Sequence, residues 1–294
     1  MPTATRSPLL ALVGVTAVWG VTFVQVQDAL ALYPLFAFLA VRFAISTAVL
    51  LPFAWRPLRA LPREGLIAGM GVGALLATAY GLQTAGLERT TVSSTGFITG
   101  LYVVVAPLLA LFLFRTPVPG AVWLGVVCAV AGLLLLNGAP GGSAAGNALV
   151  LGCAVVTGVQ IVVLERYAPR YDARALTLLQ MATAFVGFTM IALATGQVEA
   201  PHGRTVWAAL VVTGVFAGAF GFLVATWVQA RTTAARAALV FTLEAPFAAL
   251  FGVLLAGEVL GWSGWLGCAV MMVGIVLAEP AAAAALVRLV PRGR

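Results

Sequence analysis

The sequence predicts an all-α polytopic membrane protein whose ten transmembrane helices form two inverted five-helix repeats. Three observations predict this fold: an apolar composition, an alternation of arginines between successive loops, and an Ala-Pro motif that occurs once in each half of the chain. The composition identifies the solvent, the arginines count the membrane crossings, and the motif indicates the internal symmetry.

The composition is that of a protein surrounded by lipid. Hydrophobic residues make up 62% of the 294 residues and charged residues only 9%, and the mean hydropathy is +1.09, which is too apolar for a water-facing surface. A helix needs about 20 apolar residues to cross a hydrocarbon layer of about 30 Å, so the chain has room for about ten crossings. The apolar stretch from Leu9 exceeds a signal-peptide core and shows no small-residue cleavage site, so we interpret it as the first retained span.

Ten apolar segments follow one another, separated by short stretches of glycine, proline and arginine. The first five are residues 9–27, 34–55, 65–86, 92–114 and 120–137. The second five are residues 146–165, 173–195, 205–229, 235–256 and 262–279.

The arginines predict the orientation, because basic residues accumulate in short cytoplasmic loops. With the N-terminus inside, only Arg89 and Arg204 lie outside, and Arg42 lies within a span. The cytoplasmic residues are then Arg6, Arg56, Arg59, Arg63, Arg115, Arg166, Arg170, Arg174, Arg231, Arg236, Arg288, Arg292 and Arg294. Gaining or losing one helix destroys this partition, so ten helices with both termini in the cytoplasm are predicted.

A short sequence match indicates that the two halves are related. Ala106-Pro107 in the fourth segment matches Ala245-Pro246 in the ninth, 139 residues later, and Leu124-Gly125 in the fifth is echoed by Leu266-Gly267 in the tenth. Each half has five spans, so the second half enters the membrane with opposite polarity, which is an inverted repeat with a site expected near the midplane. The predicted units are residues 8–138, residues 146–279 and a cytoplasmic tail at 280–294.

Glycines and prolines in the spans are interpreted as structural. Gly65, Gly69 and Gly73 recur at every fourth position, a spacing that lets helices approach closely in lipid. Pro107 and Pro246 each remove a backbone hydrogen bond and are expected to kink their helices.

Several kinds of chemistry are excluded by the residues the chain lacks. There is no lysine, so a Walker A loop and a retinal or pyridoxal Schiff base are ruled out. Cys128, Cys153 and Cys268 show no CxxC spacing and are interpreted as small buried hydrophobic residues, and the single histidine, His202, lies in a predicted external loop. We therefore predict no metal site and no cofactor, and the net charge of +7 needs no nucleic-acid partner because the topology explains it.

Four motifs resemble those of a known family. The first segment contains Trp19-Gly20 followed by Thr22-Phe23, and the second contains Arg42-Phe43. The ninth contains Leu243-Glu244-Ala245-Pro246 and ends in Gly257-Glu258. Together with the span count and the repeat, these motifs resemble the EamA-like members of the drug/metabolite transporter superfamily over nearly the whole chain. The resemblance implies two EamA-like five-helix repeats and a proton-linked or facilitated exporter of amino acids, related metabolites or drugs that has no ATPase subunit.

Arg42 and Glu244 are the two charged residues near the middle of predicted spans. A charge at the bilayer centre costs at least about 2.5–3.5 kcal/mol on insertion scales, so each is expected to face an aqueous cavity or a partner. Three roles are open for Glu244: accepting a proton during transport, binding an ammonium group, or locking helices through hydrogen bonds. For Arg42 the roles are a helix lock or recognition of a substrate carboxylate.

Polar and aromatic residues on helix faces are the candidates for a substrate site, since small amphiphilic ligands bind between aromatic walls with a few polar groups. In the repeat register of 139, Tyr102 is expected to correspond to Phe241 and Val105 to Glu244. The candidate substrate-binding residues are Trp19, Thr22, Tyr80, Gln83, Thr99, Tyr102, Gln160, Phe241 and Glu244.

The function expected is export of small metabolites, such as aromatic or otherwise amphiphilic amino acids, across the cytoplasmic membrane of a bacterium. Two alternatives stay open: a multidrug or cationic-amphiphile exporter and, from another class, a membrane-embedded lipid-modifying enzyme. A channel is disfavoured because no Thr-Val-Gly-Tyr-Gly filter or acidic ring occurs. The expected partners are a small-molecule substrate, protons and membrane lipids.

Overall fold

The computed structural model describes residues 6–87, 89–138, 141–257 and 259–278, and this part of the chain is entirely helical. The predicted tail at 280–294 and Glu258 lie outside the described residues. The helices of the first half are α1 (Arg6–Leu30), α2 (Leu35–Arg59), α3 (Arg63–Leu87), α4 (Val92–Gly100), α5 (Tyr102–Phe114) and α6 (Gly120–Asn137). Those of the second half are α7 (Ala144–Tyr167), α8 (Ala173–Ala194), α9 (Arg204–Val211), the π-helix η1 (Val212–Gly221), α10 (Phe222–Gln229), α11 (Ala234–Phe241), α12 (Glu244–Ala256) and α13 (Trp262–Ala278).

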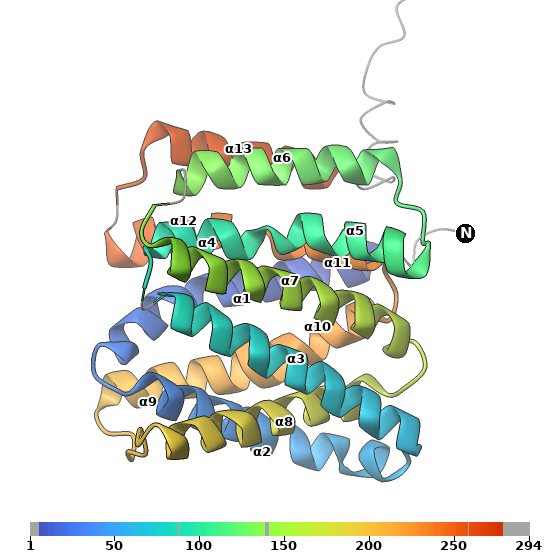
Figure 1. The fold of residues 1–294 in the computed structure, drawn as a ribbon, viewed down its shortest axis with the longest axis vertical. Coiled ribbons are helices and arrows are strands. Elements are labelled where there is room, and N and C mark those ends of the chain that lie inside the picture. Colours follow the sequence, from blue (N-terminus) through green and yellow to red (C-terminus); the bar gives the residue numbers. More distant parts are fainter. Residues whose placement is uncertain (1–5, 88, 139–140, 258, 279–294) are drawn as a thin grey trace, which may run out of the picture.

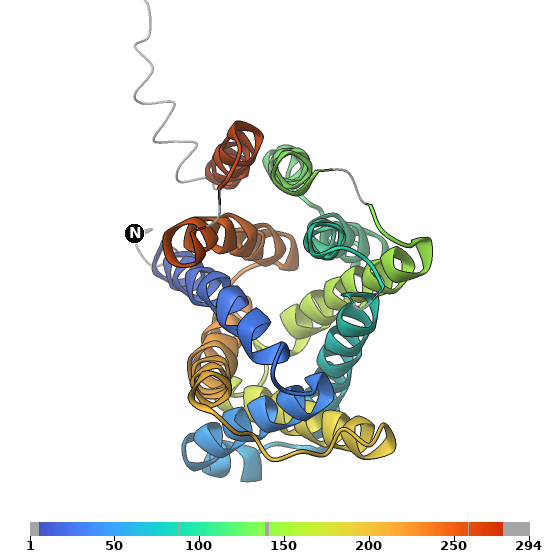
Figure 2. The same cartoon turned by 90° about the vertical axis from the view of Figure 1, so that its left-hand side faces the viewer.

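These helices form a polytopic membrane bundle, as the sequence predicts. Eight helical segments of the described chain are long and apolar enough to cross a membrane, and two shorter apolar helices, Pro8–Thr22 and Trp262–Ala278, complete the set. The helices run nearly alongside one another, with α6 and α13 as an outlying pair at one edge (Figure 1). Figure 2 looks along the bundle from the end where α1 turns into α2.

Three of the spans are discontinuous. The fourth breaks at Leu101, where the amide of Leu101 donates to the carbonyl of Ile98 and Val104 donates to Leu101. The ninth breaks at Thr242 and Leu243, with the same tightened i to i−3 pattern. The eighth passes from α9 through η1 into α10, and π-helical turns of this kind occur mostly at functional sites.

Close glycine contacts relate the two halves by an approximate two-fold axis. A Cβ on Gly73 of α3 would lie 2.9 Å from Gln180 Cα in α8, and one on Gly214 of η1 would lie 3.1 Å from the Arg42 carbonyl oxygen in α2. These contacts are equivalent because Gln180 and Arg42 occupy matching places in the two halves.

The α6 and α13 helices show the same symmetry. A Cβ on Gly132 would lie 2.6 Å from the Gly267 carbonyl oxygen, and one on Gly267 would lie 2.6 Å from that of Gly132. Gly125 and Gly274 form the matching reciprocal pair. Since only glycine permits this backbone approach, the interface depends on these positions, and the small-residue spacing is confirmed as a packing device.

The register expected between the fourth and ninth spans is wrong by three residues. The N-caps Thr91 and Thr233, the breaks at Leu101 and Leu243, and the left-handed C-caps Arg115 and Gly257 are each 142 residues apart, not 139.

The change of register alters which residues are equivalent. Tyr102 corresponds to Glu244, as the first residue of α5 and of α12 respectively, and Val105 corresponds to Phe247. The expected pairs of Tyr102 with Phe241 and Val105 with Glu244 are therefore incorrect.

The physical reason lies in the prolines. Pro246 is the third residue of α12, where an amide has no intrahelical acceptor, so a proline costs nothing there. Pro107 lies six residues into α5, inside the helix. The Ala-Pro motif thus occupies different positions in the two half-helices and does not mark the structural repeat.

The loop between α8 and α9 is fastened to the turn between α1 and α2. The Tyr33 hydroxyl donates to the Glu199 carbonyl oxygen, and the Phe36 amide donates to Gln197 Oε1 at 3.0 Å. Burial and the nearby Glu199 carboxylate raise the pKa of Tyr33 above its ordinary value, so this phenol stays a hydrogen-bond donor at neutral pH.

Candidate functional site

Arg42 of α2 is a buried guanidinium with unused hydrogen-bonding capacity. The residue is 7% exposed, and its Nε has no hydrogen-bond partner among the described residues. The guanidinium carbon lies 5.5 Å from the ring centre of Tyr80 and 5.7 Å from that of Phe43, distances at which a cation is attracted by an aromatic face. Aromatic faces hold this charge in place and leave donors available.

Glu244 lies at the break between α11 and α12. It is the first residue of α12, where the free amides and the helix dipole favour a negative charge. The side chain is half-buried and interacts electrostatically with Arg42. Within the described chain, however, no nitrogen of Arg42 comes within the 4.0 Å of Glu244 oxygen that an ion pair requires.

Tyr80 and Tyr102 complete the surroundings of the two charges. Tyr80 of α3 interacts electrostatically with both Arg42 and Glu244, and its ring packs edge-on against Phe43 with ring centres 5.5 Å apart. Tyr102 of α5 is 7% exposed and also interacts with Glu244. The first residues of the two symmetry-related half-helices, a phenol and a carboxylate, therefore face a common region, an arrangement typical of sites built on broken helices.

A hydrogen-bonded pair lies next to this group on α3 and α4. Gln83 Nε2 donates to Thr99 Oγ1 at 3.2 Å. The Cys153 thiol of α7 contacts Thr157 Oγ1 at 3.8 Å and lies within reach of Thr99. Cys153 was expected only as a buried hydrophobic residue, and spacing along the chain gave no sign of these contacts.

Three aromatic rings form a second cluster, contributed by α1, α10 and α11. The Trp19 ring centre lies 5.2 Å from that of Phe222 and 5.5 Å from that of Phe241. Trp19 Nε1 donates to the carbonyl oxygen of Ala217 in η1 at 3.0 Å. Gly221 makes room for the indole, because a Cβ there would lie 2.8 Å from Nε1. Phe222 was not predicted, since no motif or polar stripe marks it.

Two of the predicted residues use their polar groups elsewhere. The Thr22 hydroxyl donates to the carbonyl oxygen of Trp19 in its own helix at 2.7 Å. Gln160 Nε2 donates to Gln180 Oε1 at 3.4 Å, and Gln180 Nε2 donates to Thr226 Oγ1 at 3.3 Å. The structure therefore places Gln160 in a buried polar chain between α7, α8 and α10, where it links helices.

Gln25, Thr213 and Gln229 were also missed by sequence reasoning. Each carries a buried side-chain oxygen without a partner among the described residues, and a buried polar group without a hydrogen bond is costly.

Comparison with known proteins gives the family. The model of the EamA-like transporter family matches residues 6–138 and 144–278. The chain belongs to the EamA-like transporter family. It is 30% identical over 268 residues to an uncharacterized transporter of Archaeoglobus fulgidus, covering 91% of this chain and 84% of that protein.

The EamA-like fold is also found in a solved structure. A chain described as "Crystal structure of protein" matches with a TM-score of 0.80 at 20% sequence identity, over 95% of this chain and 99% of that one. The family places the protein in the drug/metabolite transporter superfamily, so it is a multi-pass membrane transporter.

The family resemblance now has a physical basis at Gly20. A Cβ on Gly20 would lie 2.6 Å from Phe247 Cβ, so this glycine lets α1 pack directly on α12. The equivalent Gly158 of α7 packs on Val105 of α5 in the same way, at 2.5 Å from Val105 Cγ1. The Trp19-Gly20 pair thus fixes the indole beside a close helix contact.

Proposed function

We propose that this EamA-like protein is a secondary transporter that exports small amphiphilic metabolites, such as aromatic amino acids, through the region between its two repeats. One observation carries the proposal: Arg42 and Glu244, opposite charges on facing helices, interact without forming an ion pair. Charges kept apart in this way are available to a ligand or a proton, whereas a structural lock would join them.

The two charges and the aromatic rings match the parts of an amino acid. Arg42 supplies donors that suit a carboxylate, and Glu244 supplies an acceptor for an ammonium group or a proton. Trp19, Phe241 and Tyr102 offer aromatic surface, and Gln83 with Thr99 offers amide and hydroxyl groups. Thr22 and Gln160 act in helix packing in this proposal.

Proton coupling is proposed for Glu244. A carboxylate at a helix break inside a membrane is a natural proton acceptor, and a proton gradient needs no ATPase subunit or cofactor. The cycle then alternates between a Glu244 carboxylate that holds an ammonium or a proton and a neutral form that releases it.

The location proposed is the cytoplasmic membrane of a bacterium, with both termini inside. The turn between α7 and α8 and the start of α3, which carry most of the loop arginines, then lie in the cytoplasm.

A second candidate is export of cationic amphiphiles, which Glu244 and the aromatic cluster favour and which does not require Arg42. Counterflow assays in proteoliposomes, with a panel of amino acids, their methyl esters and lipophilic cations, distinguish the two. We expect exchange of zwitterionic amino acids that is lost in Arg42→Gln. Exchange of esters and cations alone, unaffected by Arg42→Gln, supports the second candidate. Turnover of a lipid with no exchange of any compound contradicts both.

A further inference from the structure

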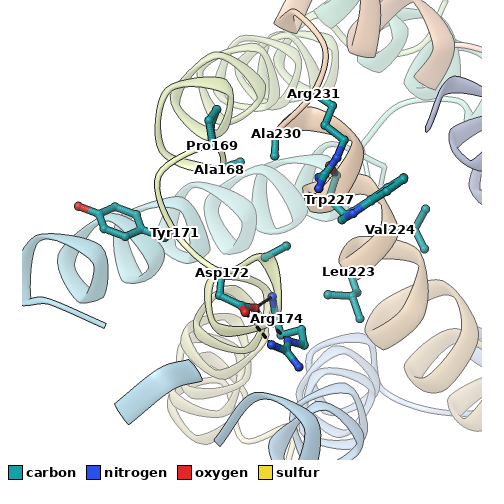
Figure 3. A pocket seen from close by; sticks show the side chains of 11 residues that line it. Ala168, Pro169, Tyr171, Asp172, Arg174, Leu223, Val224, Trp227, Ala230 and Arg231 are labelled. Carbon is teal, nitrogen blue, oxygen red and sulfur yellow. Dashed lines mark hydrogen bonds and ion pairs between the residues drawn. The ribbon is translucent and has the colours of Figure 1, made fainter. Parts of the chain in front are cut away.

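A pocket of about 660 Å³ lies away from the charged and aromatic residues described above, between the α7–α8 turn and one face of α10. Its walls come from the turn residues and from positions of α10 that recur on one helix face. In Figure 3, Trp227 and Arg231 stand on one side of the pocket and Asp172 and Arg174 on the other.

The charges that line the pocket leave one cation uncompensated. Asp172 Oδ2 accepts from Arg174 Nη2 at 2.7 Å, and Asp172 Oδ1 accepts from Arg174 Nε at 3.0 Å. These bonds lower the pKa of Asp172, so the pair stays ionised and neutralises itself. Arg231 has no carboxylate within ion-pair distance in the described part of the chain.

Arg231 is held in position without being neutralised. Its Nη1 donates to the carbonyl oxygen of Trp227 at 2.7 Å, and its guanidinium carbon lies 4.4 Å from the centre of the Trp227 ring. Both contacts orient the group, and neither removes its charge. A fixed guanidinium loses little freedom on binding an anion, which favours affinity.

The remaining walls are apolar and lead toward the aromatic cluster. Leu223 and Val224 line the pocket, and they follow Phe222, whose ring packs on Trp19. A ligand that fits must therefore combine an anionic head with an apolar body. The pocket lies at the arginine-rich end of the bundle, which is the cytoplasmic end in the proposed orientation.

We propose that this pocket is an uptake site on the cytoplasmic side, where Arg231 binds the carboxylate of an amphiphilic anion or zwitterion before it reaches Trp19. The uptake role rests on the proposed transport function, whereas binding of the anion does not. The same chemistry is offered by the headgroup of an acidic phospholipid, so the source of the anion is part of the test.

The test measures binding of dansylglycine, an aromatic carboxylate, by fluorescence anisotropy to the full-length protein in phosphatidylcholine nanodiscs. Its uncharged amide is the matched control ligand, and Arg204→Gln, which removes an arginine at the other end of the bundle, is the control variant. We expect Arg231→Gln to weaken dansylglycine binding about five- to tenfold, to leave amide binding unchanged, and Arg231→Lys to restore most of the affinity. Equal binding of acid and amide, or unchanged affinity in Arg231→Gln, overturns the proposal.

Two further arms separate the sources and the failures. Adding phosphatidylglycerol to the nanodiscs should leave dansylglycine binding unchanged, and displacement of the probe by this lipid contradicts an uptake site. Glu244→Gln should bind dansylglycine like the wild type even where it transports nothing, so loss of transport and loss of this site are distinguishable.

Discussion

At the scale of single residues, glycines decide where helices touch. Gly14 and Gly20 lie in the same helix, α1, yet a Cβ on Gly14 meets nothing within 4 Å, whereas one on Gly20 would overlap Phe247 and the backbone of Ala248. The pair therefore separates intrinsic helix propensity from packing.

We expect Gly20→Ala to lower the free energy of unfolding by about 1–3 kcal/mol, because overpacking forces α1 away from α12. Gly14→Ala is the matched control and should be neutral or stabilising by up to about 1 kcal/mol, since alanine is the better helix former. Thermal unfolding in detergent measures both. Equal melting temperatures for the two variants would contradict the close contact.

A second residue-scale prediction concerns Asp172, the N-cap of α8. Its pKa is lowered mainly by the hydrogen bond from Arg174, so the stabilisation is present above the unfolded pKa near 4 and is lost as the pH falls through the lower folded value. Asparagine caps helices as well as aspartate does, so Asp172→Asn should cost only the exposed ion pair, about 0.5 kcal/mol at pH 7.

The measurement is unfolding of Asp172→Asn and wild type at pH 7 and pH 3. The difference should shrink at the lower pH. A difference that grows on acidification would show that the Asp172 carboxylate does not stabilise α8.

At the scale of elements, the broken spans carry the function. The breaks at Leu101 and Leu243 set Tyr102 and Glu244 at equivalent helix starts, and η1 presents its carbonyl of Ala217 to Trp19. Hydropathy predicts each span as one continuous segment, because a π-turn or a tightened turn leaves the apolar pattern unchanged. The sequence therefore predicts the spans and misses their interruptions.

The two prolines give a prediction at this scale. Pro246→Ala should change the free energy of unfolding by no more than about 0.5 kcal/mol, because the amide at this position of α12 has no intrahelical acceptor. Pro107→Ala adds an amide inside α5 and should stabilise the helix measurably, since proline in a helix interior costs about 3 kcal/mol. Thermal unfolding of the two variants checks this, and equal effects at both prolines would contradict the register of 142 residues.

At the scale of the whole molecule, the number of spans and the presence of a repeat were predictable, whereas the register of the repeat was not. Lipid forces long apolar helices and loop arginines record their order, so both are written in the sequence locally. The register depends on lengths that compensate between helix and loop: α2 ends at Arg59 and α8 ends earlier, at Ala194, before a longer loop. Side-chain partners such as Gln180 for Gln160 depend on that register and were missed for the same reason.

The proposed topology predicts the labelling of single cysteines in a variant in which Cys128, Cys153 and Cys268 are replaced by serine. We expect His202→Cys in the α8–α9 loop to react with a membrane-impermeant maleimide in intact cells. Pro169→Cys in the α7–α8 turn should react only after lysis. The reverse pattern would invert the orientation and place the pocket of Arg231 outside the cell.

The central claim is that the separated charges of Arg42 and Glu244 serve transport. The most direct test compares wild type, Glu244→Gln and the control Glu64→Gln in proteoliposomes, using a substrate from the counterflow panel with and without an imposed pH gradient. Glu64 pairs with Arg170 on the surface at 3.6 Å, so its variant removes a carboxylate without touching the site. We predict that Glu244→Gln folds and loses the response to the gradient while Glu64→Gln retains it. An unchanged response in Glu244→Gln would contradict a proton site at Glu244.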